Sequence, residues 1–252
     1  VWSGHPVGFC LLTDKDRQYV AYYDDQRRMT VAARGLNEDR WEHVRLPSTL
    51  GWDSHNYITM TIDDAGYLHL CGNMHCVPLT YFRTDAPRDI GTFRQISHML
   101  GSEEDRVTYP QFLRGPRQDL IFTYRDGGSG KGRQIYNVYD TARKRWRRLL
   151  DKPLLDGEGK NSAYLDRIQR DRQGTFHLCW VWRSSPDCAT NHDVCYARSH
   201  DLVHWQKSDG TSLALPITSR TCEIVDPVPA GQGLINGNVR LGFDDENRPV
   251  IS

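Results

Sequence analysis

The sequence predicts an all-β fold built from four-stranded sheets that repeat along the chain. Three observations support this fold class: internal repeats about 54 residues apart, runs that alternate apolar and polar residues, and frequent turn dipeptides such as Asp-Gly and Gly-Gly. No long segment of the 252 residues places apolar side chains at the i, i+3, i+4 and i+7 positions of an amphipathic helix. We therefore expect helix to be a minor component.

The first repeat relates two similar stretches, "DDAGYLHLC" at 63–71 and "DRQGTFHLC" at 171–179, which begin 108 residues apart. Midway between them, "GPRQDLIFTYR" at 115–125 is another turn followed by a predicted strand. Half of the separation is on the order of one propeller blade. Within the repeat, His69 and His177 occupy equivalent positions, so we predict that they are architectural.

A second series has a similar spacing. Each member joins a turn to an aromatic residue, with steps of 52, 53 and 59 residues between Trp41, Phe93, Trp146 and Trp205. Strands in groups of four at this period favour a β-propeller, in which each blade packs on the next. About five blades fit the chain, either as a closed ring or as part of a larger one. We expect a single propeller domain over residues 1–252, incomplete at its C-terminus.

Individual strands are predicted from alternation. The run "YITMTID" at 57–63 places Ile58, Met60 and Ile62 on one face, with the period of two that strands show. The segment "SHDLVHW" at 199–205 resembles the Asp box of sialidase-type propellers, in a form one residue shorter. In that motif the aspartate ties down its turn and the tryptophan packs between strands, so it indicates fold and not chemistry.

Composition excludes several kinds of partner. Lys plus Arg and Asp plus Glu balance at 32 each, so no net charge attracts nucleic acid or anionic membrane. No run approaches the roughly 18 apolar residues that a membrane span needs. We therefore expect a monomer that binds neither nucleic acid nor membrane. The seven cysteines do not decide between an oxidising and a reducing compartment.

Several long segments resemble one known family. They include "DSHNYITMTIDDAGYLHLCGNMHCVPLTYFRT", "RVTYPQFLRG", "IFTYRDGGSGKG", "RLLDKPLLDGEGKNSAY", "PDCATNHDVCYARSHDLVHW" and "IVDPVPAGQGLINGN". Together they resemble the BNR-repeat β-propeller polysaccharide lyases of the ulvan lyase family. The resemblance implies a seven-bladed propeller and a secreted or periplasmic protein. It also implies that ulvan is cleaved by β-elimination at a 4-linked uronic acid, glucuronate or iduronate, next to sulfated rhamnose.

Such an elimination sets clear chemical requirements. Removing the proton at C5 of a uronic acid is difficult beside a negative carboxylate, so a cationic or hydrogen-bonding group must first neutralise that charge. Arginine suits this task. A base must then take the C5 proton while an acid protonates the departing glycosidic oxygen, and histidine and tyrosine can fill these roles. The reaction requires no metal or other cofactor.

Four residues on successive predicted blades could supply these groups: His55, His75, Tyr109 and Arg125. The resemblance implies that His75 and Tyr109 form the acid/base pair and that Arg125 neutralises the carboxylate. It gives His55 as the second active-site histidine. The residues do not decide which of His75 and Tyr109 is the base. Both have a structural alternative, because a histidine at a strand end and an aromatic before a proline are commonly packing residues.

Substrate-binding roles are assigned to residues in the same segments: Asn56, Tyr124, Arg125 and Lys131. Lys131 lies on the glycine-rich turn "DGGSGKG", where it could approach a sulfate group or be an ordinary solvated residue. This turn lacks the G-x-x-x-x-G-K-[ST] pattern of nucleotide-binding loops. We therefore reject nucleotide binding.

The stretch "CATNHDVC" suggests a structural zinc site. Cys188, His192 and Cys195 are three potential ligands within eight residues, and His204 or Cys222 could complete a tetrahedron. The alternatives are a disulfide between Cys188 and Cys195, or thiols that pack as small apolar groups.

Two other functions remain open from the sequence. A sialidase-like glycoside hydrolase would share the propeller and the Asp box, but it needs three arginines on the substrate carboxylate and a tyrosine nucleophile paired with a glutamate. We find no such set. A non-catalytic sugar-binding propeller would instead present aromatic platforms without a reachable His/Tyr pair. The sequence does not decide between endo and exo action.

Overall fold

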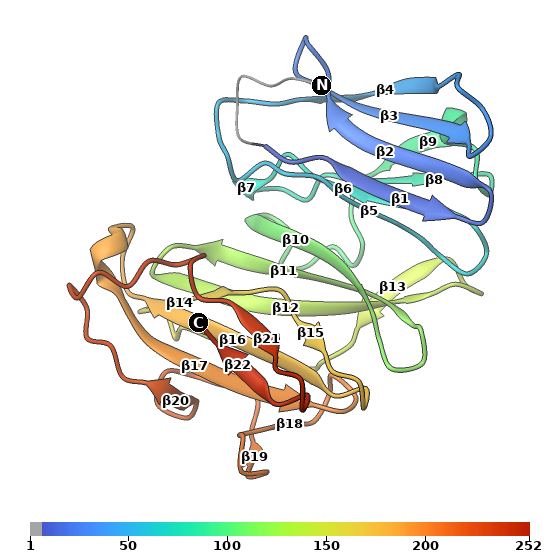
Figure 1. Ribbon diagram of the computed structural model, residues 1–252. Coiled ribbons are helices and arrows are strands. Elements are labelled where there is room, and N and C mark those ends of the chain that lie inside the picture. The colour runs from blue at the N-terminus through green and yellow to red at the C-terminus, as the bar shows by residue number, and fades with distance from the viewer. Residues whose placement is uncertain (1–6) are drawn as a thin grey trace. The chain divides into compact units, whose positions relative to one another are not determined.

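The protein is described by a computed structural model that covers residues 7–252 (Figure 1). Strands provide nearly all of its regular structure, and the helical segments among these residues are two short 3₁₀ turns, Ile90–Thr92 and Cys188–Thr190. The prediction of an all-β fold with little helix is confirmed. No helix in the described part of the chain is long and apolar enough to cross a membrane.

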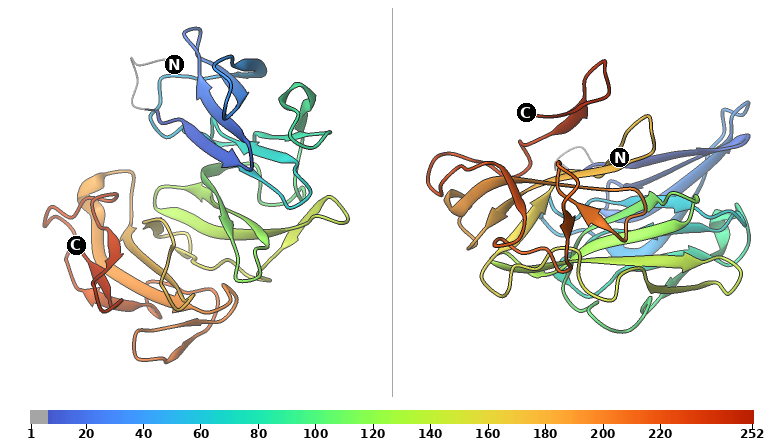
Figure 2. Two further views of the ribbon diagram at one scale, coloured as in Figure 1. Left: turned by 45° about the vertical axis from the view of Figure 1, so that its right-hand side comes forward. Right: turned by 90° about the horizontal axis from the view of Figure 1, so that it is seen from below.

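The first two sheets are four-stranded and antiparallel. The first has the order β1-β2-β3-β4, with β1 Cys10–Asp14, β2 Arg17–Tyr23, β3 Arg28–Gly35 and β4 Glu42–Thr49. The second has the order β5-β6-β8-β9, with β5 Thr59–Ile62, β6 Leu68–Cys71, β8 Tyr81–Thr84 and β9 Phe93–Ile96. The two further views in Figure 2 show the same grouping of strands.

The third sheet adds a strand from an earlier part of the chain. Its order is β13-β12-β11-β10-β7, with β7 His75–Val77, β10 Val107–Arg114, β11 Leu120–Gly128, β12 Lys131–Asp140 and β13 Arg145–Arg148. Strand β7 lies between β6 and β8 in sequence, but it pairs with β10. This crossover is the feature of the fold that matters most for the candidate site.

The last two sheets lie in the C-terminal part. One follows the order β14-β16-β17-β18-β19, with β14 Ser162–Leu165, β16 Phe176–Arg183, β17 Asn191–Ser199, β18 Trp205–Gln206 and β19 Ser212–Leu213. Two more strands join it: β15 Gln169–Arg170 pairs with β16, and β20 Glu223–Asp226 pairs with β17. The other sheet contains β21 Leu241–Phe243 and β22 Pro249–Ile251. Five sheets agree with the prediction of about five blades.

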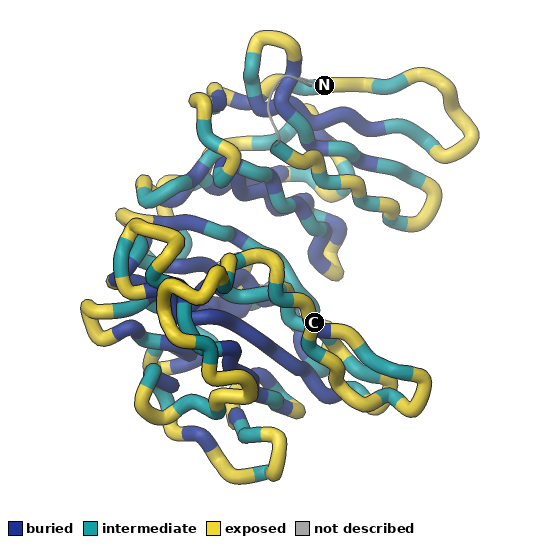
Figure 3. Tube along the Cα trace, turned by 60° about the vertical axis from the view of Figure 1, so that its left-hand side comes forward, coloured by how far each residue is buried: buried dark blue, intermediate teal, exposed yellow. Residues whose placement is uncertain are grey.

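The chain divides into two compact units. The first contains the described residues up to Leu113 together with 120–126 and 138–147, and the second contains 114–119, 127–137 and 148–252. This division does not test the prediction of one domain over residues 1–252. In Figure 3 the buried residues follow the strands, whereas many connecting loops are exposed.

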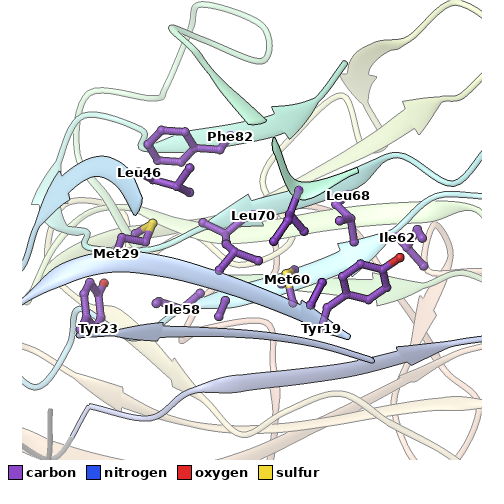
Figure 4. Close-up of a cluster of buried hydrophobic side chains, with 14 of the residues drawn as sticks. Tyr19, Tyr23, Met29, Leu46, Ile58, Met60, Ile62, Leu68, Leu70 and Phe82 are labelled. Carbon is purple, nitrogen blue, oxygen red and sulfur yellow. The ribbon is translucent and has the colours of Figure 1, made fainter. Parts of the chain in front are cut away.

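The core of the first unit is formed by side chains from the first and second sheets (Figure 4). They include Tyr19, Met29 and Leu46 from the first sheet and Met60, Leu70 and Phe82 from the second. Ile58, Met60 and Ile62 are 5–7% exposed and belong to this cluster, so the face predicted from alternation is the buried one. Burial of this apolar face is the main force that holds such sheets together.

The repeated turns are built in the same way. In the second sheet, Asp63 Oδ1 accepts hydrogen bonds from the amides of Ala65 and Tyr67 at 3.0 and 2.9 Å. In the fourth, Asp171 Oδ1 accepts bonds from the amides two and four residues on, at 2.9 and 2.8 Å. The glycine between them has a left-handed backbone in both turns, with φ of 87° at Gly66 and 91° at Gly174.

Behind the first of these turns, His69 is fully buried. Its Nδ1 lies 2.7 Å from the hydroxyl of Tyr81, and its Nε2 lies 3.4 Å from Asp63 Oδ2. Both ring nitrogens therefore have protein partners. The histidine links the turn to strand β8.

The same network recurs behind the second turn, where His177 is 3% exposed. Its Nδ1 lies 2.6 Å from the hydroxyl of Tyr196 and its Nε2 lies 3.1 Å from Asp171 Oδ2. Burial lowers the pKa of His177 and outweighs the opposite effect of the Asp171 carboxylate. The prediction that His69 and His177 are architectural is confirmed.

The Asp box also behaves as predicted. Asp201 Oδ1 accepts hydrogen bonds from the amides of Val203 and His204 at 2.8 and 2.7 Å, which holds the turn. Trp205 is 1% exposed, and its Nε1 donates to the carbonyl of Leu202 at 3.2 Å. The motif is structural.

Candidate active site

The candidate site is centred on Asp53, in the loop between β4 and β5. Asp53 Oδ1 accepts a hydrogen bond from the amide of His55 at 2.9 Å and lies 2.6 Å from the Nδ1 of the same histidine. Its other oxygen, Oδ2, makes a short contact with the Nδ1 of His75. Because a carboxylate accepts hydrogen bonds, both rings are assigned a proton on Nδ1 and a lone pair on Nε2.

Asp53 is held in its charged form. Partial burial favours the neutral acid, but the hydrogen bonds from the His55 amide and ring and from the His75 ring outweigh it and lower the pKa of Asp53 to about 2. The side chains of Asp53, His55 and His75 are 31%, 39% and 34% exposed. The site is therefore anionic at one point and open to solvent.

The rings of the site form a continuous set of contacts. His55 and His75 stack with centroids 4.0 Å apart and an interplanar angle of 20°. Tyr109 lies 5.9 Å from His55, and Tyr57 stacks on Tyr109 at 6.3 Å. The guanidinium carbon of Arg125 lies 4.8 Å from the centroid of the Tyr109 ring. Two imidazoles, two phenols and one guanidinium thus lie close together within the first unit.

Strand β7 explains how His75 reaches this position. The chain leaves the second sheet after β6, and β7 pairs with the start of β10, with His75 opposite Thr108. Asn73 anchors the connecting turn, since its Nδ2 donates to Ser48 Oγ at 2.9 Å and to the carbonyl of Thr49 at 3.0 Å. His75 is therefore placed beside Tyr109, which follows Thr108 directly.

The backbone at this crossover is unusual. Cys76 and Tyr109 have φ of 56° and 57°, in the left-handed region that residues other than glycine rarely adopt. The register of β10 against β7 also shifts between Val107 and Thr108. Each such residue costs on the order of 1–3 kcal/mol, and strain of this kind clusters at functional sites.

Arg125, on β11, is 2% exposed. Its Nη2 donates to Thr108 Oγ1 at 3.3 Å and to the sulfur of Cys76 at 3.6 Å, and Thr108 Oγ1 in turn accepts from the Cys76 amide at 2.8 Å. These contacts hold the guanidinium against the aromatic ring of Tyr109. The Tyr109 ring therefore lies over the Arg125 guanidinium.

The structure brings together His55, His75, Tyr109 and Arg125, as the sequence predicted. The other predicted substrate-binding residues, Asn56, Tyr124 and Lys131, have different surroundings. Asn56 is 8% exposed, and its carbonyl accepts a hydrogen bond from Tyr23 at 2.6 Å. Tyr124 is fully buried and packs on Phe122, with ring centroids 5.5 Å apart, and its contact with substrate stays a prediction. The strand is covered on both faces there. Lys131 is exposed and belongs to the second unit.

Three residues of the site were not predicted: Asp53, Tyr57 and Thr108. A signal for Asp53 was present, because an aspartate two residues before His55 can accept the amide hydrogen bond that forms an Asx turn. Tyr57 and Thr108 had no comparable local signal. Their roles follow from the pairing of β7 with β10.

The four predicted zinc ligands do not come together. Cys188 is exposed, and His204, whose side chain is 85% exposed, is bound through Nδ1 to Asp201 at 2.7 Å. His192 Nδ1 lies 2.9 Å from Asp193 Oδ2. This ligand set is therefore not assembled in the structure: Cys188 lies on the 3₁₀ turn, His192 and Cys195 lie on β17, and His204 lies in the turn that follows. Zinc binding itself stays a prediction.

Cys195 pairs instead with the alternative fourth ligand. Its sulfur lies 3.6 Å from the sulfur of Cys222. This hydrogen bond lowers the pKa of Cys222 to about 7 and, together with burial, raises the pKa of Cys195. The alternative considered from the sequence, a disulfide between Cys188 and Cys195, is absent, since no disulfide joins cysteines among residues 7–252.

The protein has repeated antiparallel sheets and a cluster of His, Tyr and Arg side chains at the crossover from β6 to β7. These features define a class of protein: propeller-type β proteins with a polar site at a connection between two sheets. The comparisons with known proteins narrow this class. Residues 17–252 match the model of a family described as "BNR repeat-containing family member", and the chain belongs to this family. Membership in a BNR-repeat family was predicted from the sequence and is confirmed.

Several relatives are carbohydrate-active. The chain is 22% identical over 279 residues to an ulvan lyase of Alteromonas sp. (strain LOR), an alignment that covers 93% of this chain and 55% of that protein. The crystal structure of the polysaccharide lyase Uly1 matches with a TM-score of 0.79 at 17% identity, over 97% of this chain and 65% of that one. A PL25 ulvan lyase matches with a TM-score of 0.71 at 16% identity, over 98% and 64%.

These structural likenesses show the fold, so the predicted all-β, propeller-type architecture is confirmed, with four strands in two of the five sheets. The chain spans about half the length of the ulvan lyase and under two thirds of each of the two solved structures.

Proposed function

We propose that the protein is a polysaccharide lyase that cleaves a uronic-acid polymer by β-elimination. One observation supports this most strongly: His55, His75, Tyr109 and Arg125 lie close together in the first unit, with Asp53 orienting both histidines. These are the groups that an elimination beside a carboxylate needs, namely a cation, a base and an acid.

In the proposed reaction, Arg125 supplies the positive charge that offsets the substrate carboxylate. Its charge is permanent, and in a buried setting it acts through a lower effective dielectric than in water. Since the Tyr109 ring covers Arg125, substrate binding displaces this ring and brings the phenol to the sugar. The substrate carboxylate would then take the place of the Tyr109 ring beside the Arg125 guanidinium.

The base and acid are the imidazole of His75 and the phenol of Tyr109. One of them takes the C5 proton, the C4–O bond breaks as the C4–C5 double bond forms, and the other protonates the departing oxygen. The Nε2 lone pair of each histidine is available because Asp53 occupies the Nδ1 side. With this tautomer His75 can act as the base and Tyr109 as the acid. The reverse assignment needs a second proton on His75, at Nε2, and an ionised Tyr109. Asp53 acts as a positioning residue.

The proposed substrate is ulvan, cleaved at a 4-linked glucuronate or iduronate next to sulfated rhamnose. One structural neighbour, an ulvan lyase with a TM-score of 0.69 at 16% identity over 98% of this chain and 64% of that one, is described as bound to -[GlcA(1-4)Rha3S]-. A polymer of this kind meets an enzyme outside the cytoplasm, so we place the protein in the periplasm or outside the cell. No cofactor is needed for the proposed step.

Ultraviolet absorbance tests the proposal. Incubation with ulvan should raise the absorbance, because elimination leaves a double bond conjugated with the uronate carboxylate. Tyr109→Phe should lower the rate by about 10²-fold or more, since it removes only the proposed proton-transfer group. Tyr196→Phe removes a structural hydroxyl elsewhere and is the matched control. Chain shortening without an absorbance rise would indicate a hydrolase, and binding without shortening would indicate a sugar-binding propeller.

A further inference from the structure

Asp53, His55 and His75 have a second chemical possibility. Among residues 7–252, these three form the group of His, Cys, Asp and Glu donor atoms close enough to share one ion, all within 4.8 Å of one another. We propose that this group binds a divalent transition-metal ion, such as Zn²⁺, Ni²⁺ or Co²⁺, and that the ion switches the site off. The proposal that the metal binds is argued from the geometry of the three side chains. The proposal that the metal inhibits the protein also rests on the proposed function.

The donor types favour this class of ion. Two imidazole nitrogens and one carboxylate oxygen are ligands that zinc, nickel and cobalt bind well. Calcium requires 6–8 oxygen ligands, and magnesium is held through carboxylates, phosphates and several waters, so neither fits a set with two nitrogens. Three protein ligands leave further positions for water, which suits a site open to solvent.

The geometry requires only a small adjustment. Zinc lies about 2.0–2.1 Å from nitrogen and oxygen ligands, which places neighbouring donors of a tetrahedral site roughly 3.3 Å apart. At present Asp53 Oδ1 lies 2.6 Å from His55 Nδ1, a hydrogen-bond distance. An ion must therefore spread this pair by less than ~1 Å, and it must draw together any pair that lies farther apart, since the donor atoms all lie within 4.8 Å of one another. All three side chains are between 31% and 39% exposed and have room to do so.

Charge also favours the ion. The Asp53 carboxylate accepts hydrogen bonds from the His55 amide and from both histidine rings, and it would supply one negative charge to the ion.

Metal binding would change the tautomer of both histidines. In the metal-free site Nδ1 carries the proton and Nε2 the lone pair. An ion on Nδ1 requires the lone pair there, so the proton of each neutral ring moves to Nε2, with no net release. Nε2 then becomes a donor and can no longer accept a proton from substrate. The stacked pair would lose its function as a base.

The binding can be measured without substrate. We expect the full chain, titrated with Co²⁺ in equilibrium dialysis, to bind one ion at a site whose absorption lacks a thiolate-to-metal charge-transfer band. This spectrum separates the site from the Cys195 and Cys222 thiols. Asp53→Asn and His75→Gln should each weaken binding by about tenfold or more. His98→Gln, at an exposed histidine outside the group, should leave it unchanged.

Several results would overturn the inference: no Co²⁺ binding outside the thiols, or affinity unchanged in both Asp53→Asn and His75→Gln. A circular dichroism spectrum identifies any variant that fails to fold, and His55→Gln then takes its place. The switching role is tested by adding Zn²⁺ to the ulvan assay and removing it with a chelator, which should abolish and restore activity. If the protein binds the metal but does not cleave ulvan, the proposed function is refuted and the proposed metal site stands. If the metal-loaded protein cleaves ulvan at an undiminished rate, the proposed inhibition by metal is refuted.

Discussion

The first unit contains two sets of Asp, His and Tyr side chains that differ in almost every physical respect. In the buried set, His69 has one ring nitrogen on Tyr81 and the other on Asp63. In the open set, Asp53 binds the Nδ1 atoms of both histidines, and no hydrogen bond to the Nε2 of either is described among residues 7–252. The buried histidine is satisfied by the protein, whereas the open pair has a nitrogen left for a ligand.

The difference teaches that residue type alone does not assign a role. The buried set recurs 108 residues later around His177, as a property of the repeat would. Among residues 7–252 the open set occurs once, at a crossover with strained backbone at Cys76 and Tyr109. Repetition marks the scaffold, while a single departure from the repeat marks the candidate site.

The largest effect is expected at the arginine of the open set. Arg125→Ala should reduce turnover of ulvan by about 10³-fold, because one preorganised charge is lost beside the developing negative charge. Arg83, which is 8% exposed and donates to Tyr139 at 2.8 Å, is the matched structural arginine. Arg83→Ala should destabilise the fold and leave turnover per folded molecule unchanged. Equal turnover in both folded variants would remove Arg125 from the site.

A smaller effect is expected at the aspartates of the two sets. Asp53→Asn should lower kcat by about 10–100-fold with little change in KM, as is typical when the partner that orients a functional histidine is lost. Nitrogen NMR shifts of the rings should report the loss of the fixed Nδ1–H tautomer. Asp63→Asn should instead lower the free energy of unfolding without changing kcat. A change in KM alone, with unchanged tautomers, would contradict a positioning role for Asp53.

The free energy of unfolding distinguishes a tyrosine of the buried network from the tyrosine of the open site. Tyr196→Phe removes the hydroxyl 2.6 Å from His177 Nδ1 and leaves a buried ring nitrogen without its partner. The free energy of unfolding should fall by about 1–3 kcal/mol, measured by urea denaturation. Tyr109→Phe, at the open site, should change it by far less. The opposite order would mean that Tyr109 is the structural residue.

The smallest effect is a dependence of stability on pH. The pKa of His177 is lowered in the folded state from its ordinary value of 6.5, so the unfolded chain binds the proton more tightly. The contribution of this residue is therefore fully present above pH 6.5 and decreases as the pH falls toward the folded pKa, by at most about 1.4 kcal/mol per pH unit. Urea unfolding between pH 8 and 5 measures it. The slope should be reduced in His177→Gln, and an unreduced slope would assign it to other groups.

Much of the scaffold could be predicted because its turns and strand faces are specified by residues close together in the sequence. The aspartate and glycine of each repeated turn specify a backbone path within a few residues, and strand alternation shows which face is buried. The repeat also distinguished the architectural histidines His69 and His177, which occupy equivalent positions, from His75, which has no counterpart in the repeat. Alternation carries no signal at Tyr124 and Arg125, which are both buried, because a strand that is covered on both faces shows no contrast between them.

The sequence by itself determined the blade spacing, the turn chemistry and the residue types of the site. Only the tertiary structure decided that Asp53, His75 and Tyr109 meet. That meeting depends on β7, a strand of three residues that is too short to show a period of its own, and on its pairing with β10 some thirty residues further along the chain. Pairing between distant segments is set by packing of the whole unit, and no local pattern encodes it.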